Sequence, residues 1–330
     1  MNVWLVVLVR VIVALGLMLV NGVVMIYMLR KVLAHLHLRL GPMDNGWKGI
    51  TQTVFDVLKL LTKEDPTPAA ADRWLFYLAP AVVFVPSLAA YAALPFSNSA
   101  VMANLDLGLL YTFAIMSLIP LGILMAGWAS NNKWSLIGGV RAVGAQITYE
   151  VPMLLAALPV AMMAGSLNLG DIVRAQQSVW FWVNIPSLVL FFVAGLIETG
   201  QTPFDLAEAD SELVSGYATE YASMKFGLLF LSEFSNTFIF SALMVTLFFG
   251  GWRLPFVPGE WIQSFAPVIF IFKTYLMIAL LMVIRGTLPR IRVDQLLSLG
   301  WKVLLPASIA WVLISGFVMK LGQQLVGGGL

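Results

Sequence analysis

The chain has 330 residues, of which 60% are apolar and 11% charged, and its mean hydropathy is +0.90. Soluble domains usually carry about 25% charged residues, so this composition excludes a disordered protein and argues against a water-soluble globule. The 19 basic and 17 acidic residues nearly cancel, so the net charge gives no sign of a nucleic-acid partner. At about 20 apolar residues for each membrane crossing, plus connections, the length suits roughly eight transmembrane helices.

Residues that bind metals are scarce. The chain has no cysteine, which excludes disulfides, iron–sulfur ligation and cysteine-bound zinc within it. Its two histidines, His35 and His37, are separated by one residue and do not share a helical face, so we expect no metal site. The apolar first 28 residues lack the basic start and the cleavage site of a signal peptide. We therefore expect an uncleaved first membrane helix.

Long runs without charged residues mark most of the expected membrane helices. No alternation with the period of a β-strand lies between turn signals, which disfavours a β-barrel. Backbone groups in lipid must be paired within their own segment, so these runs should be helical. The sequence predicts an all-α polytopic membrane protein, with residues 1–330 as one integral-membrane domain. We place its spans near residues 3–28, 75–95, 108–129, 138–164, 178–198, 224–250, 261–284 and 302–324.

The basic residues predict the orientation. Fourteen of the 19 lie in the connections that follow the odd-numbered spans, three lie in the opposite connections, and Arg10 and Lys273 lie within spans. Because basic loops stay in the cytoplasm, we expect both termini outside the cell membrane. The two long loops, 29–74 and 199–223, should then be cytoplasmic.

The first long loop contains an amphipathic segment, residues 46–63. Its apolar residues Ile50, Val54, Val57 and Leu61 recur at helical spacing and oppose a polar stripe. The segment is too short to span a bilayer. We therefore predict a helix that lies at the membrane interface or packs on the bundle.

The second long loop begins with a helix-start pattern. Thr202 would be a hydroxyl N-cap, Pro203 the first helical residue and Asp205 an acid in the first turn. The pattern predicts a helix that starts here.

This loop is also rich in acids, with no basic residue between them. Asp205, Glu208 and Glu212 would share one helical face, Asp210 lies off that face, and Glu220 follows a break at Gly216. Clustered carboxylates repel one another when ionised, so such groups share or pass protons. The alternative is a solvated acidic loop.

Four ionisable residues lie in or at the edge of predicted spans: Glu150, Glu198, Glu233 and Lys273. A charged side chain at the bilayer centre costs about 2.5–3.5 kcal/mol on insertion scales. One interpretation is a buried route for protons. The alternative is that Lys273 pairs with one of the glutamates as an internal tether. We favour the route, because one lysine cannot neutralise three acids.

Several motifs follow one another along nearly the whole chain. They are RLGP (39–42), DVLKLLTKED (56–65), LAP (78–80), GWASNNKWSLIGGVRA (127–142), ITYEVP (147–152), ETGQTPFDLAEADSELVSGYATEYASMKFG (198–227) and LPRIRVDQLLSLGWK (288–302). Together they resemble the H-type membrane subunit of respiratory complex I. This resemblance favours a functional interpretation of the acidic loop.

The resemblance implies a membrane subunit of a proton-translocating NADH-quinone oxidoreductase. Such a subunit forms part of a quinone chamber, and buried carboxylates couple quinone reduction to proton movement. The chain itself would hold no covalently bound cofactor and would not be catalytic alone. Quinone would be the substrate, and iron–sulfur clusters would lie in hydrophilic partner subunits beside other membrane subunits.

The resemblance also assigns roles to residues. The chamber would include Arg39, Asp56, Lys59 and Glu64. The proton route would include Glu150, Glu198, Asp205, Glu208, Asp210, Glu212, Glu220, Glu233 and Lys273. Docking of partner subunits would use Arg285, Arg290, Arg292 and Asp294.

Two other functions stay open at this point. One is the homologous anchor subunit of a membrane-bound hydrogenase or of a ferredoxin- or F420-linked ion pump. The other is a stand-alone secondary transporter that uses its acids for proton coupling.

Overall fold

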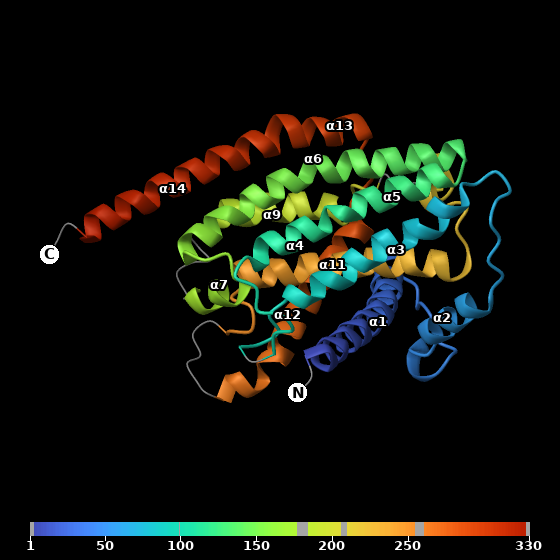
Figure 1. The fold of residues 1–330 in the computed structure, drawn as a ribbon, viewed down its shortest axis with the longest axis horizontal. Helices are drawn as coiled ribbons and strands as arrows, with labels where there is room; N and C mark the ends of the chain where they lie inside the picture. Colours follow the sequence, from blue (N-terminus) through green and yellow to red (C-terminus); the bar gives the residue numbers. More distant parts are fainter. Residues whose placement is uncertain (1–2, 99, 177–183, 206–209, 255–260, 328–330) are drawn as a thin grey trace.

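A computed structural model describes residues 3–98, 100–176, 184–205, 210–254 and 261–327. Within these ranges the chain is almost entirely helical, and the strand-like pairing found there is one isolated bridge between Pro95 and Val101. The helices form an elongated bundle (Figure 1). The predicted all-α fold is confirmed.

Seven helical segments in the described ranges are long and apolar enough to cross a membrane. An eighth expected span, 178–198, is described only from its second part, a 14-residue apolar helix. The count agrees with the prediction of about eight. The long helices are α1 (Val3–Leu36), α3 (Arg73–Ala90), α4 (Gly108–Met116), α5 (Leu118–Ala129), α6 (Lys133–Ala164), α9 (Ile185–Glu198), α11 (Ser223–Phe248), α12 (Trp261–Thr287) and α14 (Leu305–Gly327).

Shorter elements fill the connections. The amphipathic helix predicted in the first long loop is present as α2 (Gln52–Thr62). The other short α-helices are α7 (Leu169–Ala175), α10 (Asp210–Leu213) and α13 (Val293–Leu299). Single turns of 3₁₀-helix lie at Trp47–Gly49, Tyr91–Ala93 and Gly216–Ala218, and a π-helical turn at Gly300–Leu304 joins α13 to α14.

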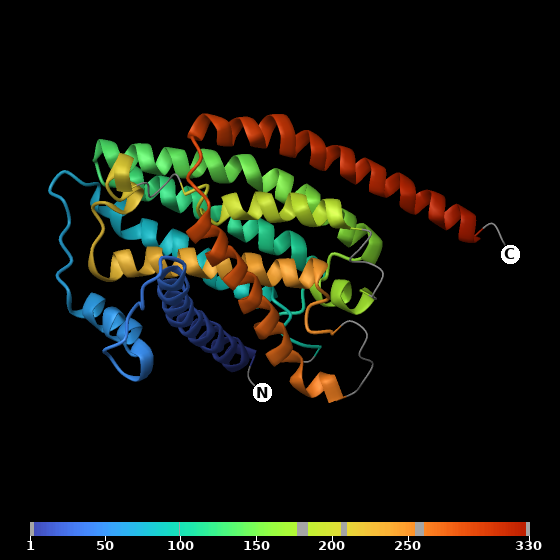
Figure 2. The same ribbon diagram turned by 180° about the vertical axis from the view of Figure 1, so that it is seen from behind.

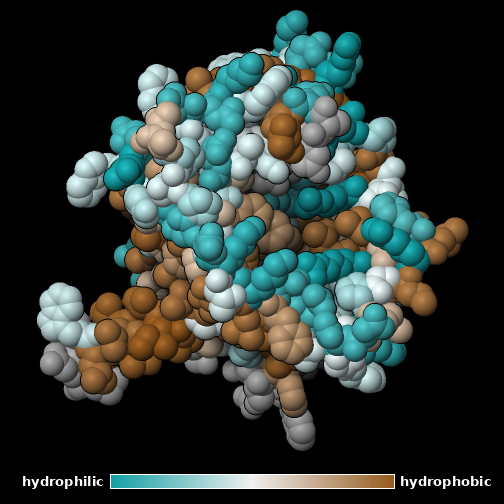
Figure 3. Space-filling view, turned by 90° about the vertical axis from the view of Figure 1, so that its right-hand side faces the viewer, coloured by the Kyte–Doolittle hydropathy of each residue, from teal (hydrophilic) through white to brown (hydrophobic). Residues whose placement is uncertain are grey.

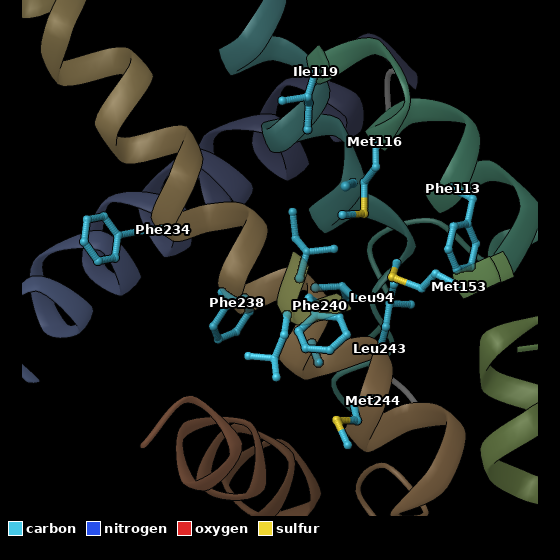
Figure 4. Packing of buried hydrophobic residues seen from close by; sticks show 14 of the residues in the cluster. Leu94, Phe113, Met116, Ile119, Met153, Phe234, Phe238, Phe240, Leu243 and Met244 are labelled. Atoms are coloured by element: carbon cyan, nitrogen blue, oxygen red, sulfur yellow. The ribbon is translucent and has the colours of Figure 1, made fainter. Parts of the chain in front are cut away.

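Helix α11 is the centre of the bundle. Of its most apolar window, 72% is buried, against 11–50% for the other candidate spans. It packs against α3, α12 and α1, and α12 crosses it beside α1 (Figure 2). Figure 4 shows Phe240 and Leu243 of α11 close to Leu94 and to Met153 of α6.

This central helix also carries buried hydroxyl groups. Ser232, Ser241 and Thr246 each donate a hydrogen bond to the backbone carbonyl four residues earlier, over 2.7–2.8 Å. A polar group in an apolar interior is costly unless it is paired. The local bonds therefore let these residues sit in the most buried helix.

The loops with the most charged residues gather at one end of the bundle. The Asp72 amide donates to the carbonyl of Ala129, and Asn132 donates from its side chain to Glu220. The first long loop and the turn between α5 and α6 therefore meet the second long loop (residues 199–223), which we call the acidic segment, at its residue Glu220. Figure 3 looks onto this end, where hydrophilic residues cover most of the surface and hydrophobic residues gather along one flank.

The prediction of a helix that begins at Thr202 is wrong, because residues 202–205 form a turn and a bend. Contacts with the loop between α12 and α13 explain the difference. The amide of Ile291 donates to the carbonyl of Pro203, and Arg290 pairs with Asp205. These bonds to a distant segment override the local helix-start pattern. The first helical residue described after it is Asp210.

Gly195 allows α9 to approach α11. A Cβ atom at Gly195 would lie 1.8 Å from Cε2 of Phe240, whose ring is fully buried and stacks on Phe191.

We predict that Gly195→Ala lowers the thermal unfolding midpoint of the detergent-purified chain, because overpacking a core costs about 1–3 kcal/mol. Gly144→Ala is the matched control, because a Cβ atom there meets nothing within 4 Å. Equal midpoints for the two variants would contradict this packing.

Candidate functional site

A cavity of about 60 Å³ lies where α5, α6, α9 and α11 meet the acidic segment. A water molecule needs roughly 10–15 Å³ on this measure, so the cavity has room for a few waters. Among its lining residues are three of the predicted acids, Glu198, Asp205 and Glu233. Other polar side chains on its wall are Arg141, Gln146 and Asn236.

Glu198 is the last residue of α9 and its side chain is buried. One of its carboxylate oxygens has no hydrogen-bond partner among the described residues, and the same holds for the amide oxygen of Gln146. Both side chains line the cavity. Buried acceptors are almost always paired in native proteins, so this wall requires a donor such as water. Glu150 lies one turn beyond Gln146 on the same face of α6.

Arginines from α12 and from the segment that follows it contact these acids. Arg285 Nη1 lies 3.8 Å from Glu233 Oε1 and donates to the side-chain oxygen of Gln201 over 3.0 Å. Arg290 Nη2 lies 3.3 Å from Asp205 Oδ2. The family resemblance implied docking of partner subunits for both arginines, and these contacts were not predicted. Because α11 and α12 run antiparallel, the end of α12 returns to the start of α11. Two consecutive predicted spans form such a hairpin, and this was the signal in the sequence from which the contacts could have been predicted.

Two further acids of the segment, Glu212 and Glu220, are not among the residues that line the cavity. Glu212, half exposed, pairs with Arg141 at 2.6 Å. Glu220 accepts a hydrogen bond of 2.7 Å from Asn132. Asp210 begins α10, and Glu208 lies outside the described residues.

Lys273 lies elsewhere. Its ammonium group donates to the carbonyls of Phe249 and Gly251, over 2.8 and 3.1 Å, beyond the end of α11. Phe249 is 16 residues after Glu233, which is about 24 Å along a helix. The alternative in which Lys273 tethers a membrane glutamate is therefore wrong.

The predicted chamber residues lie around α1 and α2. Asp56 accepts from Arg30 over 2.6 Å and from Gln52 over 3.2 Å. Arg39, Lys59 and Glu64 are exposed. The pattern did not single out Lys31, whose ammonium donates to the carbonyl of Pro42 over 2.6 Å and so holds the turn after Arg39.

The apolar stripe of α2 faces away from the bundle. Val54 and Leu61 are 46% and 55% exposed, whereas the neighbouring Thr53 is buried. Helix α2 also contacts α11 and α1, and its predicted position at the membrane interface stays a prediction. The polar face makes the contacts with α1.

In the motif at residues 288–302, Arg292 and Asp294 are exposed at the start of α13. No group of three or more metal-ligating residues occurs within the described ranges.

Comparison with known proteins decides the family. A family profile described as NADH dehydrogenase matches residues 9–316. The chain belongs to this NADH dehydrogenase family. A relative in Burkholderia vietnamiensis, named as the H-type subunit of NADH-quinone oxidoreductase, is 42% identical over 326 residues, covering 94% of this chain and 91% of the relative.

Two further relatives carry the same name. The protein of Dehalococcoides mccartyi is 39% identical over 98% of this chain and 89% of its own length. That of Rhodospirillum centenum is 43% identical over 91% of this chain and 90% of its own length. For this member of the NADH dehydrogenase family, these names favour a quinone oxidoreductase over the hydrogenase-type anchor.

The ion pair between Arg290 and Asp205 gives a test of the site's geometry. We predict that Arg290→Gln lowers the thermal midpoint of the purified chain, because it removes the partner of a mostly buried carboxylate, a loss of about 1–3 kcal/mol. Arg292→Gln, two residues along and exposed, should leave the midpoint unchanged. If Arg290→Gln lowers the midpoint equally when Asp205 is already Asn, the two residues are not coupled.

Proposed function

We propose that this chain is the membrane subunit of a proton-translocating NADH-quinone oxidoreductase, in which the acid-lined cavity serves proton movement. The observation that carries the proposal is the convergence of Glu198, Asp205 and Glu233 on one cavity. Quinone reduction takes up two electrons and two protons, and until the protons are bound the added electrons place negative charge beside any nearby carboxylate. Buried acids respond to such a change by binding or releasing protons.

The parts of the chain take different roles in this proposal. The first loop, with Arg39, Asp56, Lys59 and Glu64, forms part of the quinone chamber. The acidic segment, with Glu208, Asp210, Glu212 and Glu220, joins the chamber to the cavity, and Glu150 extends the route along α6. Lys273, beyond the end of α11, would stand at the far end of such a route.

The rest of the assembly follows from the same proposal. Iron–sulfur clusters lie in hydrophilic partner subunits, and this chain contributes no redox group and is not catalytic alone. Arg292 and Asp294 are exposed at the loop end and available for docking those partners. The long loops face the cytoplasm, and the termini lie outside a plasma membrane.

Glu198→Gln tests the acid-lined cavity. We expect assembly to be retained and proton-coupled quinone reduction to fall by at least about 100-fold, the usual contribution of a positioned proton donor or acceptor. The measurements are quinone reduction and proton uptake by the assembled complex in vesicles. Asp106→Asn, exposed in the loop before α4, is the matched control. Wild-type turnover and pumping in Glu198→Gln would remove this residue from the route.

The same preparation also tests the alternative that this chain is a stand-alone transporter. A stand-alone transporter would move protons or a solute when the isolated chain is placed in liposomes. Proton movement only in the assembled complex, with iron–sulfur proteins recovered alongside, supports the oxidoreductase.

Arg39→Ala tests the first loop as part of the chamber. Losing a hydrogen bond from a charged group costs about 1.5–3 kcal/mol, so we expect the KM for short-tailed quinone analogues to rise roughly tenfold or more. Lys302→Ala, exposed in the π-helical turn before α14, is the control. Unchanged kinetics in Arg39→Ala would place this side chain outside the chamber.

A further inference from the structure

The C-terminal end of α2 is held by the start of α11. The hydroxyl of Ser223 lies 3.0 Å from the carbonyls of both Leu60 and Lys63. The last carbonyls of a helix have no partner within the helix, so a hydroxyl placed there stabilises the helix end. Two segments that are 160 residues apart in the sequence are joined at this point.

A buried lysine makes the second contact. Lys225 is 8% exposed, and its Nζ lies 3.0 Å from Oδ2 of Asp65, three residues beyond the end of α2. The ammonium also lies over the rings of Tyr77 and Phe76 of α3, at 3.6 and 4.8 Å from their centroids. The ammonium has no hydrogen bond of good geometry among the described residues, so the nearby carboxylate and the two aromatic faces are what offset the cost of burying its charge.

The aromatic wall beneath Lys225 is itself fixed. Phe76 stacks on Tyr221, with ring centroids 4.2 Å apart and planes 9° from parallel. Burial raises the pKa of Tyr221, so its phenol stays neutral and presents no charge to Lys225. Tyr221 and Ser223 closely follow Glu220 in the sequence, so this wall continues from the acidic segment.

Polar contacts, not apolar burial, decide where α2 lies. Most of its apolar residues are exposed, including Val54, Leu58 and Leu61. On the side of α1, Arg30 holds Asp56. On the side of α11, Ser223 and Lys225 hold the helix end. With so little apolar area covered, the loss of one charged contact has a large effect on the position of α2.

We propose that Lys225 is a positioning residue for quinone reduction. By pairing with Asp65, it fixes α2 against α11 and so sets Asp56, Lys59 and Glu64 relative to the acidic segment. Lys225 touches neither the cavity nor the chamber residues themselves, and it acts through the helix that carries them. The inference rests on the proposed function, since it gives α2 a role in binding quinone.

The experiment compares Lys225→Met with Lys225→Arg in the assembled complex. Methionine keeps the apolar stem and loses the charge, whereas arginine keeps the ion pair and the aromatic contact. Lys63→Met, an exposed lysine beside the same helix end, is the matched control. Asp65→Asn removes the ion pair from its exposed side and serves if Lys225→Met fails to assemble.

Two readouts are needed. The first is amide hydrogen exchange across α2, which we expect to be at least about fivefold faster in Lys225→Met and restored in Lys225→Arg. The second is the kinetics with a short-tailed quinone, where we expect KM to rise several-fold with a smaller change in kcat.

Each outcome has a distinct meaning. Faster exchange with a raised KM, both restored by arginine, supports the proposal. Unchanged exchange overturns it, because α2 would then not depend on Lys225. Faster exchange with unchanged KM also overturns it, because the contact would be structural only. If the unmodified assembly reduces no quinone, the proposed function fails, while the exchange data still report on the contact itself.

Discussion

Ion pairs between arginines and acids join three separate parts of the chain at one end of this bundle. Arg141 comes from α6, Arg285 from α12 and Arg290 from the segment that follows it. The most exposed of these pairs, Arg141–Glu212, contributes only about 0–1 kcal/mol to stability, whereas removing one partner of a more buried pair costs about 1–3 kcal/mol. Their main effect is on geometry, because they fix a short acidic segment whose negative charges would otherwise repel one another. The cavity and its carboxylates depend on this arrangement.

The central helix connects that charged end to the rest of the membrane domain. Helix α11 begins at the acidic segment, carries Glu233 into the bundle, and is the most buried of the candidate spans. Within the helix, Ser232, Ser241 and Thr246 satisfy their hydroxyls on the helix's own backbone. A polar side chain that needs no outside partner leaves neighbouring helices free to pack closely. The carboxylate of Glu233 is different, because its partner Arg285 comes from another helix.

Much of the fold could be predicted from local signals, since charge-free runs of about 20 residues have one stable form in a bilayer. The amphipathic helix α2 was predicted from another local signal, the helical spacing of its apolar residues. The turn at residues 202–205 could not be predicted, because the bond from Ile291 that holds Pro203 spans almost 90 residues. Local patterns carry no information about such partners.

For the candidate site, too, the sequence pointed to some residues and not to their partners. Glu198 and Glu233 stood out because ionisable residues are rare in membrane spans. Their neighbours did not, since Gln146 is uncharged and Arg285 lies at a helix end, where arginines are common for other reasons. Lys273 stood out for the same reason as the glutamates, yet it caps backbone carbonyls near Gly251. Sequence alone gives the depth of such groups, whereas their partners depend on how helices pack.

The length of α1 has a consequence for the membrane around this protein. Its 34 residues extend about 51 Å, while the hydrocarbon layer is about 30 Å thick. The surplus of roughly 20 Å must be taken up by tilt or by turns that rise into the headgroups. Arg30 and Lys31 lie on the last turns, so they would reach the phosphate level together with the exposed apolar side of α2. The bilayer itself would then form one wall beside α2, and its thickness would set the height at which a lipid-soluble molecule meets the first loop.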